Sequence, residues 1–472
     1  MITGIFKKKN ILAEKKQHRA VIEVDEQLLN DITDLIESKS FTLLKNILAD
    51  IYPPDIAQII NNLDDEPGLE LFKILDDETA PEVMLELNDH PRDYILDTLN
   101  PKQISDLVGE MDSDDATDIV SELDDHIAQN VLDLMEKEDS SEVQELLTYD
   151  ESTAGGRMQK EYVAVKQTDT IENAVKAIKE ASHDSEDLYY VWVVDDEHRL
   201  IGIVSLLNIV VAEDAPNTII ADIMNHEFIS VDVNTDQQEV AKIFQKYDLV
   251  SLPVLDENKH LVGKISVDDV VDIIEEEFSE DVAKIVGSAA GELQSKSPMQ
   301  IAMLRLPWVL ITLGLELIAG LVIKMYDETL GRVILLASFM PIISAISGNT
   351  GLQAAAITVR ALDTGYASLS RWWDPIKRSL QTSIIIGLAT GIVIGIISSF
   401  WYGKAMFGIL VGVSMFFSVN ISALVGTSTP MVSKRLGFDP AITAGPFETA
   451  FQDVVGITIF LTLATLFLNW LL

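Results

Sequence analysis

Five long apolar segments dominate the C-terminal part of the chain. Each is long enough to cross a bilayer, because about 20 apolar residues span its hydrocarbon core. The pattern therefore predicts an α-helical membrane domain of five spans over residues 298–472. Five spans place the two ends of this domain on opposite sides of the membrane. The segments cover roughly residues 306–323, 331–358, 380–401, 405–432 and 441–471.

A twelve-residue repeat marks the N-terminal part of the chain. Most of the repeated apolar residues precede polar or acidic turns, such as Asp64-Asp65-Glu66 and Asp124-Asp125-His126. Short helices in such a stack must bury one another's apolar faces, so the repeat predicts an all-α superhelix over residues 26–152. Residues 1–25 form a basic arm that we expect to be flexible or to lie on a surface. The repeated positions are Ile51, Leu63, Leu75, Leu87, Leu99, Met111, Leu123, Met135 and Leu147.

A second internal repeat defines a domain over residues 153–269. Val163-Ala164-Val165 matches Ile229-Ser230-Val231, and further on Val194-Asp195 matches Leu255-Asp256. Each copy has the pattern of a strand, a helix, two strands joined by a turn, and a second helix. This α/β pattern resembles a tandem pair of cystathionine-β-synthase (CBS) domains, a module that often binds adenine nucleotides.

The end of each copy carries the residues that this resemblance assigns to a nucleotide. In that family a Ser or Thr and an acid three residues later serve the phosphate and the ribose. The resemblance implies this role for Ser205 with Asn208 and for Ser266 with Asp269. The first copy departs from the pattern, since Asn208 stands where the family has an acid. ATP is one expected ligand, and a pair used only for dimerisation and signal relay is the alternative.

Residues 270–297 show the pattern of a long amphipathic helix between the CBS repeat and the membrane domain. A solvated connecting helix is the simplest interpretation, but its place in the chain also fits a plug that gates a pore. Its apolar positions include Val270, Val271, Ile273, Ile274, Phe278, Val282 and Ile285, and its acids include Asp272, Glu275, Glu276, Glu277, Glu280 and Asp281.

The net charge is distributed very unevenly. From Pro298 onward there are ten Lys/Arg and eight Asp/Glu, which leaves 24 and 67 of the total for residues 1–297, a net of −43 against +2. Such an acidic surface argues against nucleic acid as a partner and favours cations, through long-range attraction. The chain has no cysteine, which excludes disulfides and thiolate metal ligands.

Basic residues that flank the apolar segments set the expected orientation. Eight lie on the side of the soluble half and three on the other, as in proteins whose cytoplasmic loops are enriched in Lys and Arg. The N-terminus lacks the apolar run of a secretory signal. We therefore expect a multi-pass protein of the cell inner (plasma) membrane, in contact with lipid, with the soluble half in the cytoplasm and the C-terminus outside. The eight are Lys296, Arg305, Arg360, Arg371, Lys377, Arg378, Lys434 and Arg435, and the three are Lys324, Arg332 and Lys404.

Asp453 is a carboxylate deep inside the last apolar segment. An acid at the centre of a bilayer costs roughly 2.5 kcal/mol or more, so we expect it to face a polar path and not lipid. It lies fourteen residues after Asp439, or about 21 Å along one straight helix. An acid kept neutral or paired inside a helix bundle is the alternative.

Further polar residues accompany this acid. Thr449 lies one turn earlier on the same helix face. The second segment contains Pro341, Gly348-Asn349 and Gln353, where glycine and proline allow close helix packing or a local break. Hydroxyl, amide and carboxylate oxygens suit a hard cation that keeps its water, and Mg²⁺ is the natural candidate. Asp453, Thr449 and Asn349 are thus the predicted pore ligands.

The order of these parts resembles the MgtE family of bacterial magnesium transporters over about residues 30–472. The most specific motifs are Gly348-Asn349 and the stretch from Pro446 to Asp453. The resemblance implies a homodimer whose two copies of Asp453 face one pore. It also implies that cytosolic Mg²⁺ bridges acids of the superhelix, the CBS pair and the plug helix, and closes the pore when Mg²⁺ is plentiful. The regulatory candidates are Asp268, Asp272, Glu276 and Glu280, with Asp439 at the inner mouth.

Two acids fit the resemblance less well. Glu448 lies where an uncharged side chain is expected, and Glu316 lies within the first span. Each is open to three interpretations: an added cation contact, a proton site or an acid at the lipid interface.

A channel-like transporter that admits Mg²⁺ and is gated by cytosolic Mg²⁺ is the function that the sequence predicts. No catalytic constellation and no Walker-type phosphate loop is visible, so an enzyme is not expected. One alternative is transport of another divalent cation, such as Co²⁺ or Mn²⁺. Another is a membrane sensor whose CBS pair reads adenine nucleotide, although such a sensor would not need polar residues inside its spans.

Overall fold

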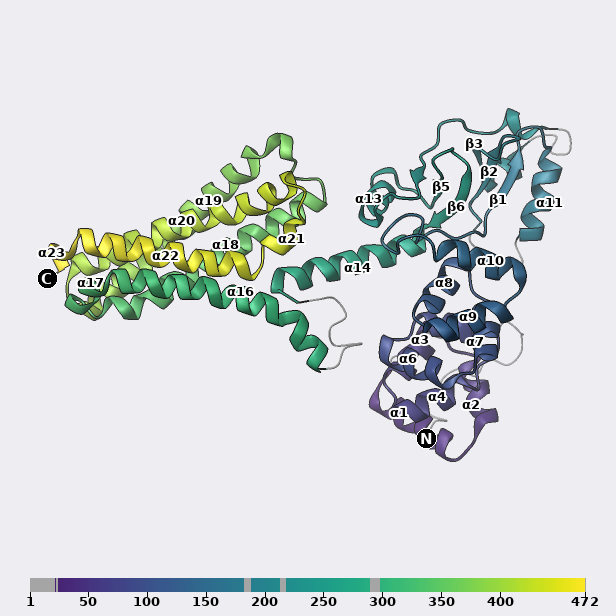
Figure 1. The fold of residues 1–472 in the computed structure, drawn as a ribbon, viewed down its shortest axis with the longest axis horizontal. Helices are drawn as coiled ribbons and strands as arrows, with labels where there is room; N and C mark the ends of the chain where they lie inside the picture. The colour runs from purple at the N-terminus through teal and green to yellow at the C-terminus, as the bar shows by residue number, and fades with distance from the viewer. Residues whose placement is uncertain (1–21, 23, 182–187, 213–217, 289–297, 472) are drawn as a thin grey trace, which may run out of the picture. The chain divides into compact units, whose positions relative to one another are not determined.

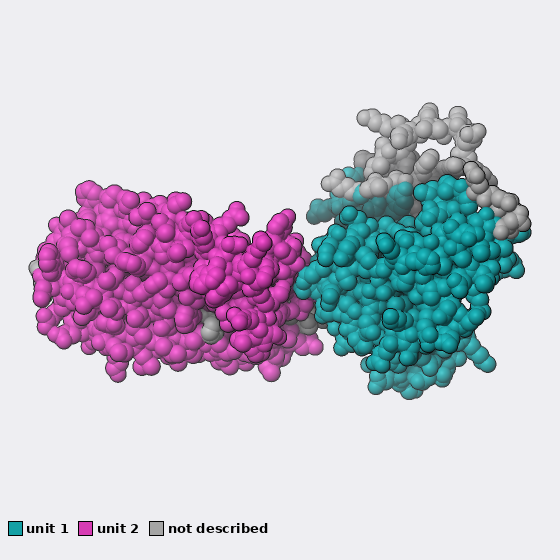
Figure 2. Space-filling view, turned by 90° about the horizontal axis from the view of Figure 1, so that it is seen from above, with its two compact units in different colours: residues 1–274 teal, residues 275–472 magenta. Residues whose placement is uncertain are grey.

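The computed structural model describes residues 22, 24–181, 188–212, 218–288 and 298–471. Its internal contacts divide the chain into two compact units, Met1–Ile274 and Glu275–Leu472, which have different colours in Figure 2. The division falls inside helix α14 (Val267–Val286), so this helix contributes to both units. Each unit has apolar cores of its own.

Short helices form the first part of unit 1, and their apolar faces meet in one continuous core (Figure 1). The twelve-residue repeat places its apolar residues in the turns between helices, where Ile51, Leu87 and Met135 are buried and only Leu147 is exposed. The predicted stack of helices is therefore confirmed. The helices are α1 (Glu26–Glu37), α2 (Phe41–Leu48), α3 (Pro53–Asn61), α4 (Asp65–Phe72), α5 (Thr79–Leu85), α6 (Asp89–Thr98), α7 (Pro101–Val108), α8 (Ser113–Ser121), α9 (Asp125–Leu134) and α10 (Lys137–Leu146).

Helix α7 has a fully formed cap at its first turn. The side chain of Asn100 accepts hydrogen bonds from the backbone N–H groups of Lys102 and Gln103, and the Gln103 side chain accepts from the Asn100 N–H. Pro101 occupies the first helical position, where its missing N–H has no partner to lose. The turn at Asn100 thus separates α6 from α7 and caps α7.

Two similar three-stranded sheets complete unit 1. In each sheet the first strand pairs parallel with the second, and the second pairs antiparallel with the third. Val165 pairs with Val193 in the first sheet and Val231 with Val254 in the second, which is the predicted alignment of the two copies. The first copy contains β1 (Val163–Lys166), α11 (Ile171–Ala181), β2 (Tyr190–Val194), β3 (Leu200–Ser205) and α12 (Leu206–Val211); after η3 (Ile220–Asp222), the second contains β4 (Val231–Asp232), α13 (Gln237–Tyr247), β5 (Ser251–Leu255), β6 (Leu261–Ser266) and α14.

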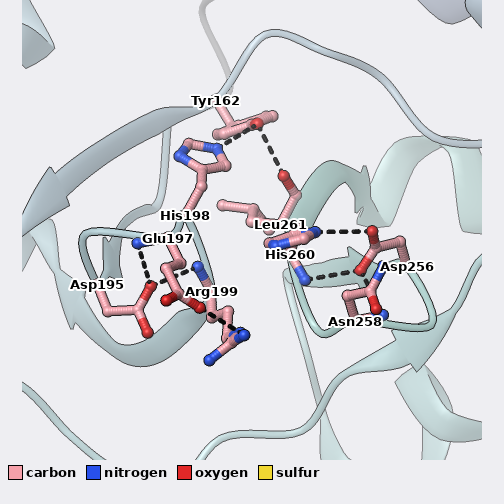
Figure 3. Close-up of polar contacts among 9 residues, drawn as sticks. All are labelled: Tyr162, Asp195, Glu197, His198, Arg199, Asp256, Asn258, His260 and Leu261. Atoms are coloured by element: carbon pink, nitrogen blue, oxygen red, sulfur yellow. Dashed lines mark hydrogen bonds and ion pairs between the residues drawn. The ribbon is translucent and has the colours of Figure 1, made fainter.

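The turn before the last strand of each copy joins the two copies, as Figure 3 shows. In each turn an aspartate, Asp195 or Asp256, accepts backbone N–H groups from the residues two and four positions later, at 2.8–2.9 Å. Arg199 and His260 then form an antiparallel bridge between the turns. The aspartates of these turns therefore stabilise the turn backbone, and the bridge between the turns joins the two copies.

Helix α14 is shorter than the helix predicted over residues 270–297. It begins at Val267, directly after β6, and ends at Val286. Gly287 has a φ of +73°, a left-handed conformation that favours glycine and ends the helix. Residues 289–297 lie outside the described part of the chain.

Unit 2 contains five helices long and apolar enough to cross a membrane, as predicted for the described residues. The last span is not one continuous helix, however, because it breaks at Ala444-Gly445 into α21 and α22. Asp453 is only seven residues past the first residue of α22, so the straight-helix estimate of its depth was wrong. The helices are α16 (Pro298–Met325), α17 (Asp327–Arg332), α18 (Leu336–Asp363), η4 (Leu369–Arg371), α19 (Trp373–Tyr402), α20 (Ala405–Arg435), α21 (Pro440–Thr443), α22 (Pro446–Leu466) and α23 (Leu468–Leu471).

Glycines let the spans cross with their backbones almost touching. A Cβ on Gly426 of α20 would lie 2.2 Å from the carbonyl oxygen of Gly351 on α18. A Cβ on Gly391 of α19 would lie 2.7 Å from the carbonyl oxygen of Gly412 on α20. Helix α18 is continuous through Pro341, so of the two predicted uses of these residues the structure shows close packing and not a break.

Replacing Gly426 with alanine should destabilise the protein, since the added methyl group must push two backbones apart. Overpacking of this kind costs about 1–3 kcal/mol. Thermal unfolding of the purified protein in detergent, followed by tryptophan fluorescence, should show a Tm several degrees below the parent. Gly320→Ala is the matched control, because nothing lies within 4 Å of a Cβ at Gly320. Equal Tm values for the two variants would contradict the close crossing.

Candidate cation sites

Asp453 lies where α22 packs against α16 and α18. The hydroxyl of Ser344 on α18 donates a hydrogen bond to its Oδ1. The carboxyl group of Glu316 on α16 lies within hydrogen-bonding distance of it. Two carboxyl groups this close repel each other unless they share a proton or hold a cation. The structure therefore gives Asp453 the surroundings of a cation site.

The other predicted pore residues lie on the surface of the bundle. Thr449, Asn349 and Gln353 are all exposed. Gly348 lies next to Thr449 and Asp453. A Cβ added at Gly348 would lie 3.7 Å from Thr449 Cγ2 and 4.0 Å from Asp453 Oδ1. Amide groups that face lipid without partners would be costly. This face of α18 and α22 is thus suited to water or to another polar surface at membrane depth.

Glu448 is fully buried between α18, α20 and α22, which excludes the lipid interface for this acid. Its Oε1 accepts a hydrogen bond of 2.7 Å from Gln452, and a Cβ on Gly351 would lie only 3.0 Å from the same oxygen. Its Oε2 is buried and has no hydrogen-bond partner among the described residues. Glu448 therefore lies inside the bundle, on a different face of α22 from Asp453.

Asp439 belongs to a second cluster, at the start of the last span. Its Oδ1 accepts the backbone N–H of Ala441 at 2.8 Å and so caps α21. Its Oδ2 accepts a hydrogen bond of 2.8 Å from Nζ of Lys284 on α14, and the same Nζ lies 2.7 Å from Oε1 of Glu280. Burial by itself lowers the pKa of Lys284, but the hydrogen bonds to Asp439 and Glu280 outweigh it, so the pKa is raised. Lys284 is thus a permanent cation between two predicted metal ligands.

An acid pair lies beside this lysine. Burial, followed by the charge of Asp363 and a hydrogen bond to it, raises the pKa of Asp281 to about 7. Asp363 ends α18 and Asp281 lies on α14, so the pair joins the two helices. Near neutral pH these two carboxyl groups can share one proton.

In unit 1, acids of the superhelix face acids of the CBS pair. Asp114 and Asp115 lie in the first turn of α8, while Asp268 and Asp269 lie in the first turn of α14. Burial is the main reason that the pKa of Asp114 is well above its ordinary value, and the charge of Asp269 is the next. The same two causes raise the pKa of Asp115 to about 8. This group of acids is called the acid junction below.

The acid junction is unfavourable while its carboxyl groups are all ionised. Burial raises the pKa of Asp269 to about 6 even though Ser266 donates hydrogen bonds to its carboxylate. Within the described residues, no three Asp, Glu, His or Cys side chains are arranged to hold a metal ion as they stand. A divalent cation would therefore need a small rearrangement of these side chains, and it would relieve their repulsion.

The remaining regulatory candidates lie further along α14. Asp272 and Glu276 are exposed. Burial and then the charge of Asp272 raise the pKa of Glu86 on the superhelix side, so Asp272 also faces an acid. The predicted regulatory residues do not form one site: Asp268 belongs to the acid junction, and Glu280 and Asp439 belong to the Lys284 cluster.

The residues assigned to a nucleotide differ in exposure between the two copies, since Asn208 is exposed and Ser266 is buried. Ser266 is fully buried, and Asp269 Oδ2 accepts hydrogen bonds from the Ser266 hydroxyl and backbone N–H and from Gln159. In the first copy, Ser205 caps α12 by accepting the N–H of Asn208 at 3.2 Å, and Asn208 has no carboxylate to offer a ribose. As arranged here, these hydroxyl groups and the Asp269 carboxylate take part in local hydrogen bonds at the start of α12 and α14.

Five spans with a carboxylate pair at membrane depth, joined to an acidic helical repeat and a CBS pair, are the features of a membrane transport protein with a soluble part. Family models agree with this class. The MgtE intracellular N domain matches residues 51–152, the CBS domain matches residues 154–214 and 220–276, and the divalent cation transporter domain of MgtE matches residues 340–463. Helices α1 and α2 precede the matched part of the N domain but share its core.

Individual relatives point to the same family. The magnesium transporter MgtE of Enterococcus faecalis is 34% identical over 324 residues, which cover 69% of this chain and 71% of that protein. The magnesium transporter MgtE of Thermus thermophilus is 34% identical over 323 residues, 68% of this chain and 71% of that protein. The chain therefore belongs to the MgtE family. A solved structure described as the cytosolic domain of the Mg²⁺ channel MgtE in complex with ATP is 33% identical, with a TM-score of 0.49, and covers 52% of this chain and 99% of that one.

Sequence patterns did not reveal several residues of these sites. Ser344 and the acids at the start of α8 come close to predicted site residues only through helix packing, so no spacing signal could identify them. Lys284 did leave a signal, because it is the one basic residue in α14 and lies four positions after Glu280, the spacing of a helical ion pair.

The acid junction should make the stability of the protein depend on pH and on Mg²⁺. Carboxyl groups with a raised pKa favour the folded state while protonated, so stability should fall as the pH rises from about 4 through 8, the pKa of Asp115. Asp115→Asn should flatten this fall in Tm. Mg²⁺ at 100 times its Kd should raise the free energy of unfolding of the parent by about 2.7 kcal/mol per site, and that of the variant by less.

The control is Asp97→Asn, which removes an exposed acid of α6. Thermal unfolding between pH 5 and 9, with Mg²⁺ or an ionic-strength-matched sodium salt, provides the measurement. Equal protection by both salts would mean simple screening and not a cation bound at the junction.

Proposed function

We propose that this chain is a channel-like transporter that admits Mg²⁺ through a pore formed by two copies. The observation that carries the proposal is the polar face at membrane depth, with Asp453 and Glu316 beside exposed Thr449, Asn349 and Gln353. A second copy that faces this surface would enclose a path lined by oxygen atoms. Lipid at the same face would leave amides and carboxylates without partners, at a large cost.

The ligand chemistry supports Mg²⁺ as the cargo. Carboxylate, hydroxyl and amide oxygens bind hard cations, and Mg²⁺ usually keeps several of its waters and uses one or two carboxylates. The chain has no cysteine, so no thiolate is available to select a softer metal. Co²⁺ or Mn²⁺ transport through the same path is the nearest alternative, and competition between these ions in flux measurements distinguishes the two.

The membrane potential is a sufficient driving force for this transport. An inward potential contributes about 2.3 kcal/mol per elementary charge for each 100 mV, and twice that for a divalent ion. With the soluble half in the cytoplasm and the C-terminus outside, Mg²⁺ would enter down its electrochemical gradient. ATP hydrolysis has no part in the proposal.

Cytosolic Mg²⁺ would act as the regulator through the soluble acids. The net charge of −43 in residues 1–297 attracts divalent cations, and the acid junction holds carboxyl groups that repel one another until neutralised. Binding of Mg²⁺ among Asp268, Asp272 and Glu276 would order this part and favour a closed pore. Adenine nucleotide as the regulator is less well supported, because Ser266 and Asp269 are occupied with each other.

Asp453→Asn should abolish most Mg²⁺ flux while leaving the fold intact. The amide keeps the size of the side chain and can still accept the Ser344 hydrogen bond, but it removes the charge that attracts the cation. Loss of a charged contact worth about 1.5–3 kcal/mol corresponds to a tenfold to hundredfold lower uptake. Uptake into proteoliposomes, measured with an entrapped Mg²⁺ dye, tests this expectation.

Asp327→Asn is the control, because Asp327 is an exposed acid in the connection between the first two spans. It should transport like the parent. Normal uptake by the Asp453→Asn protein would refute Asp453 as the pore carboxylate and move the search to Glu316 or Glu448.

Replacing Asp272, Glu276 and Glu280 together with alanine should keep transport active at high internal Mg²⁺, where the parent is closed. The triple variant removes three negative charges from α14 and, with them, proposed ligands for the closing cations. The measurement is Mg²⁺ uptake as a function of Mg²⁺ on the side of the soluble half.

The control is a variant in which Asp97, Glu110 and Asp133 are replaced together with alanine. It loses the same three negative charges, but from exposed positions of the superhelix. Unchanged inhibition of the α14 variant would place the sensor on the acid junction alone. Loss of inhibition in both variants would show that total charge matters and that particular ligands do not.

A further inference from the structure

The second half of α14 is docked on the inner end of the pore domain, within unit 2. Ile285 packs against an apolar cluster of Ala355, Val359, Ala441 and Ala444. Its carbonyl oxygen lies 2.6 Å from the position of a Cβ on Gly445, where the last span breaks into two helices. The guanidinium group of Arg360 lies 5.6 Å from the ring centroid of Phe278. These contacts fix α14 against α18 and α21.

At the centre of this contact, one ammonium group joins two carboxylates. Lys284 Nζ lies 2.7 Å from Glu280 Oε1 and 2.8 Å from Asp439 Oδ2. The other oxygen of Asp439 accepts the N–H of Ala441. Each oxygen of Asp439 therefore already has a donor, and a metal ion at this carboxylate would lie close to the positive charge of Lys284.

The lysine is well placed to replace an ion. Its side chain is only 26% exposed and that of Asp439 is 31% exposed, so solvent screens the pair only in part. Lys284 is also the one base among the eight acids of α14, where it offsets repulsion from Glu280 and Asp281. Unlike a bound divalent ion, it cannot leave when the cytosolic concentration falls.

We propose that Lys284 is a tethered cation that holds α14 on the pore domain in the absence of Mg²⁺, through Asp439 and Glu280. The proposal rests on the gating role proposed for α14, but its contact with the pore domain can be tested apart from transport. It predicts that two interactions stabilise the contact between α14 and the pore domain. Lys284 supplies a constant one, and Mg²⁺ on the side of the soluble half adds a second that varies with the Mg²⁺ concentration.

The absence of cysteine makes a single reporter thiol available. Ala444 is fully buried and packs in the cluster that Ile285 joins, so Ala444→Cys should be shielded whenever α14 is docked. The full-length protein in detergent is treated with a water-soluble maleimide, in EDTA or in Mg²⁺, and labelling rates are compared. The test variants, on the Ala444→Cys background, are Lys284→Gln and Lys284→Arg. Lys377→Gln is the control, because Lys377 is an exposed lysine in the first turns of α19.

In EDTA the background protein and the Lys377→Gln control should label slowly. Lys284→Gln should label about tenfold faster or more, the factor expected when a charged hydrogen bond is lost. Lys284→Arg should remain slow, and Mg²⁺ should slow the Lys284→Gln protein again. If the background already labels in EDTA as fast as Lys284→Gln, the lysine does not hold α14 and the proposal is wrong. Slow labelling of Lys284→Gln in EDTA would overturn it too.

Ala441→Cys provides a second reporter in the same cluster if Ala444→Cys fails to fold. Flux measurements on the same variants separate this proposal from the proposed function. Fast labelling of Lys284→Gln without any Mg²⁺ flux in the parent would support the lysine contact and refute Mg²⁺ transport. Normal, Mg²⁺-inhibited flux with no effect of Lys284→Gln on labelling would refute the lysine contact alone.

Discussion

Repulsion between carboxyl groups withdrawn from water is the interaction on which this structure depends. It occurs at several places, which include Asp453 with Glu316 in the spans, Asp281 with Asp363 where α14 meets α18, and Asp114 and Asp115 with Asp269 in unit 1. Each arrangement is unfavourable unless a proton or a cation is supplied. Neutralisation at any of these places, by a proton or by a bound cation, would therefore stabilise the packing of the helices that carry the acids.

Lys284 places a positive charge among these acids without a metal ion. A lysine on the same helix as the acids gives a neutralising charge that is always present, whereas the proposed regulation by Mg²⁺ would depend on the concentration of the ion. The ammonium group lies between Glu280 and Asp439, where the family resemblance led us to expect a metal. A permanent contact of this kind would set the resting position of α14, and the acids nearer the CBS pair would then adjust it.

Backbone packing decides which acids can meet. The crossing at Gly351 and Gly426 brings α18 and α20 so close that Glu448 is sealed inside the bundle. The break at Gly445 separates Asp439 from the helix that carries Asp453. Two acids that the sequence places on one span thus belong to different clusters, Asp439 to the contact with α14 and Asp453 to the contact with α16 and α18.

The sequence alone determined the order of parts, the five spans, the helical repeat and the paired CBS copies, because these follow from the period of apolar positions, which each segment carries locally. It also identified Asp453 as a candidate functional residue, since an acid within a membrane span is energetically costly. It did not determine that Ser344 and Glu316 surround Asp453, that Asp114 and Asp115 face Asp269, or that Lys284 bridges Glu280 and Asp439. Those partners lie on different helices far apart in the chain, and only the packing of helices, set by glycine contacts and breaks over a few ångströms, decides which side chains meet.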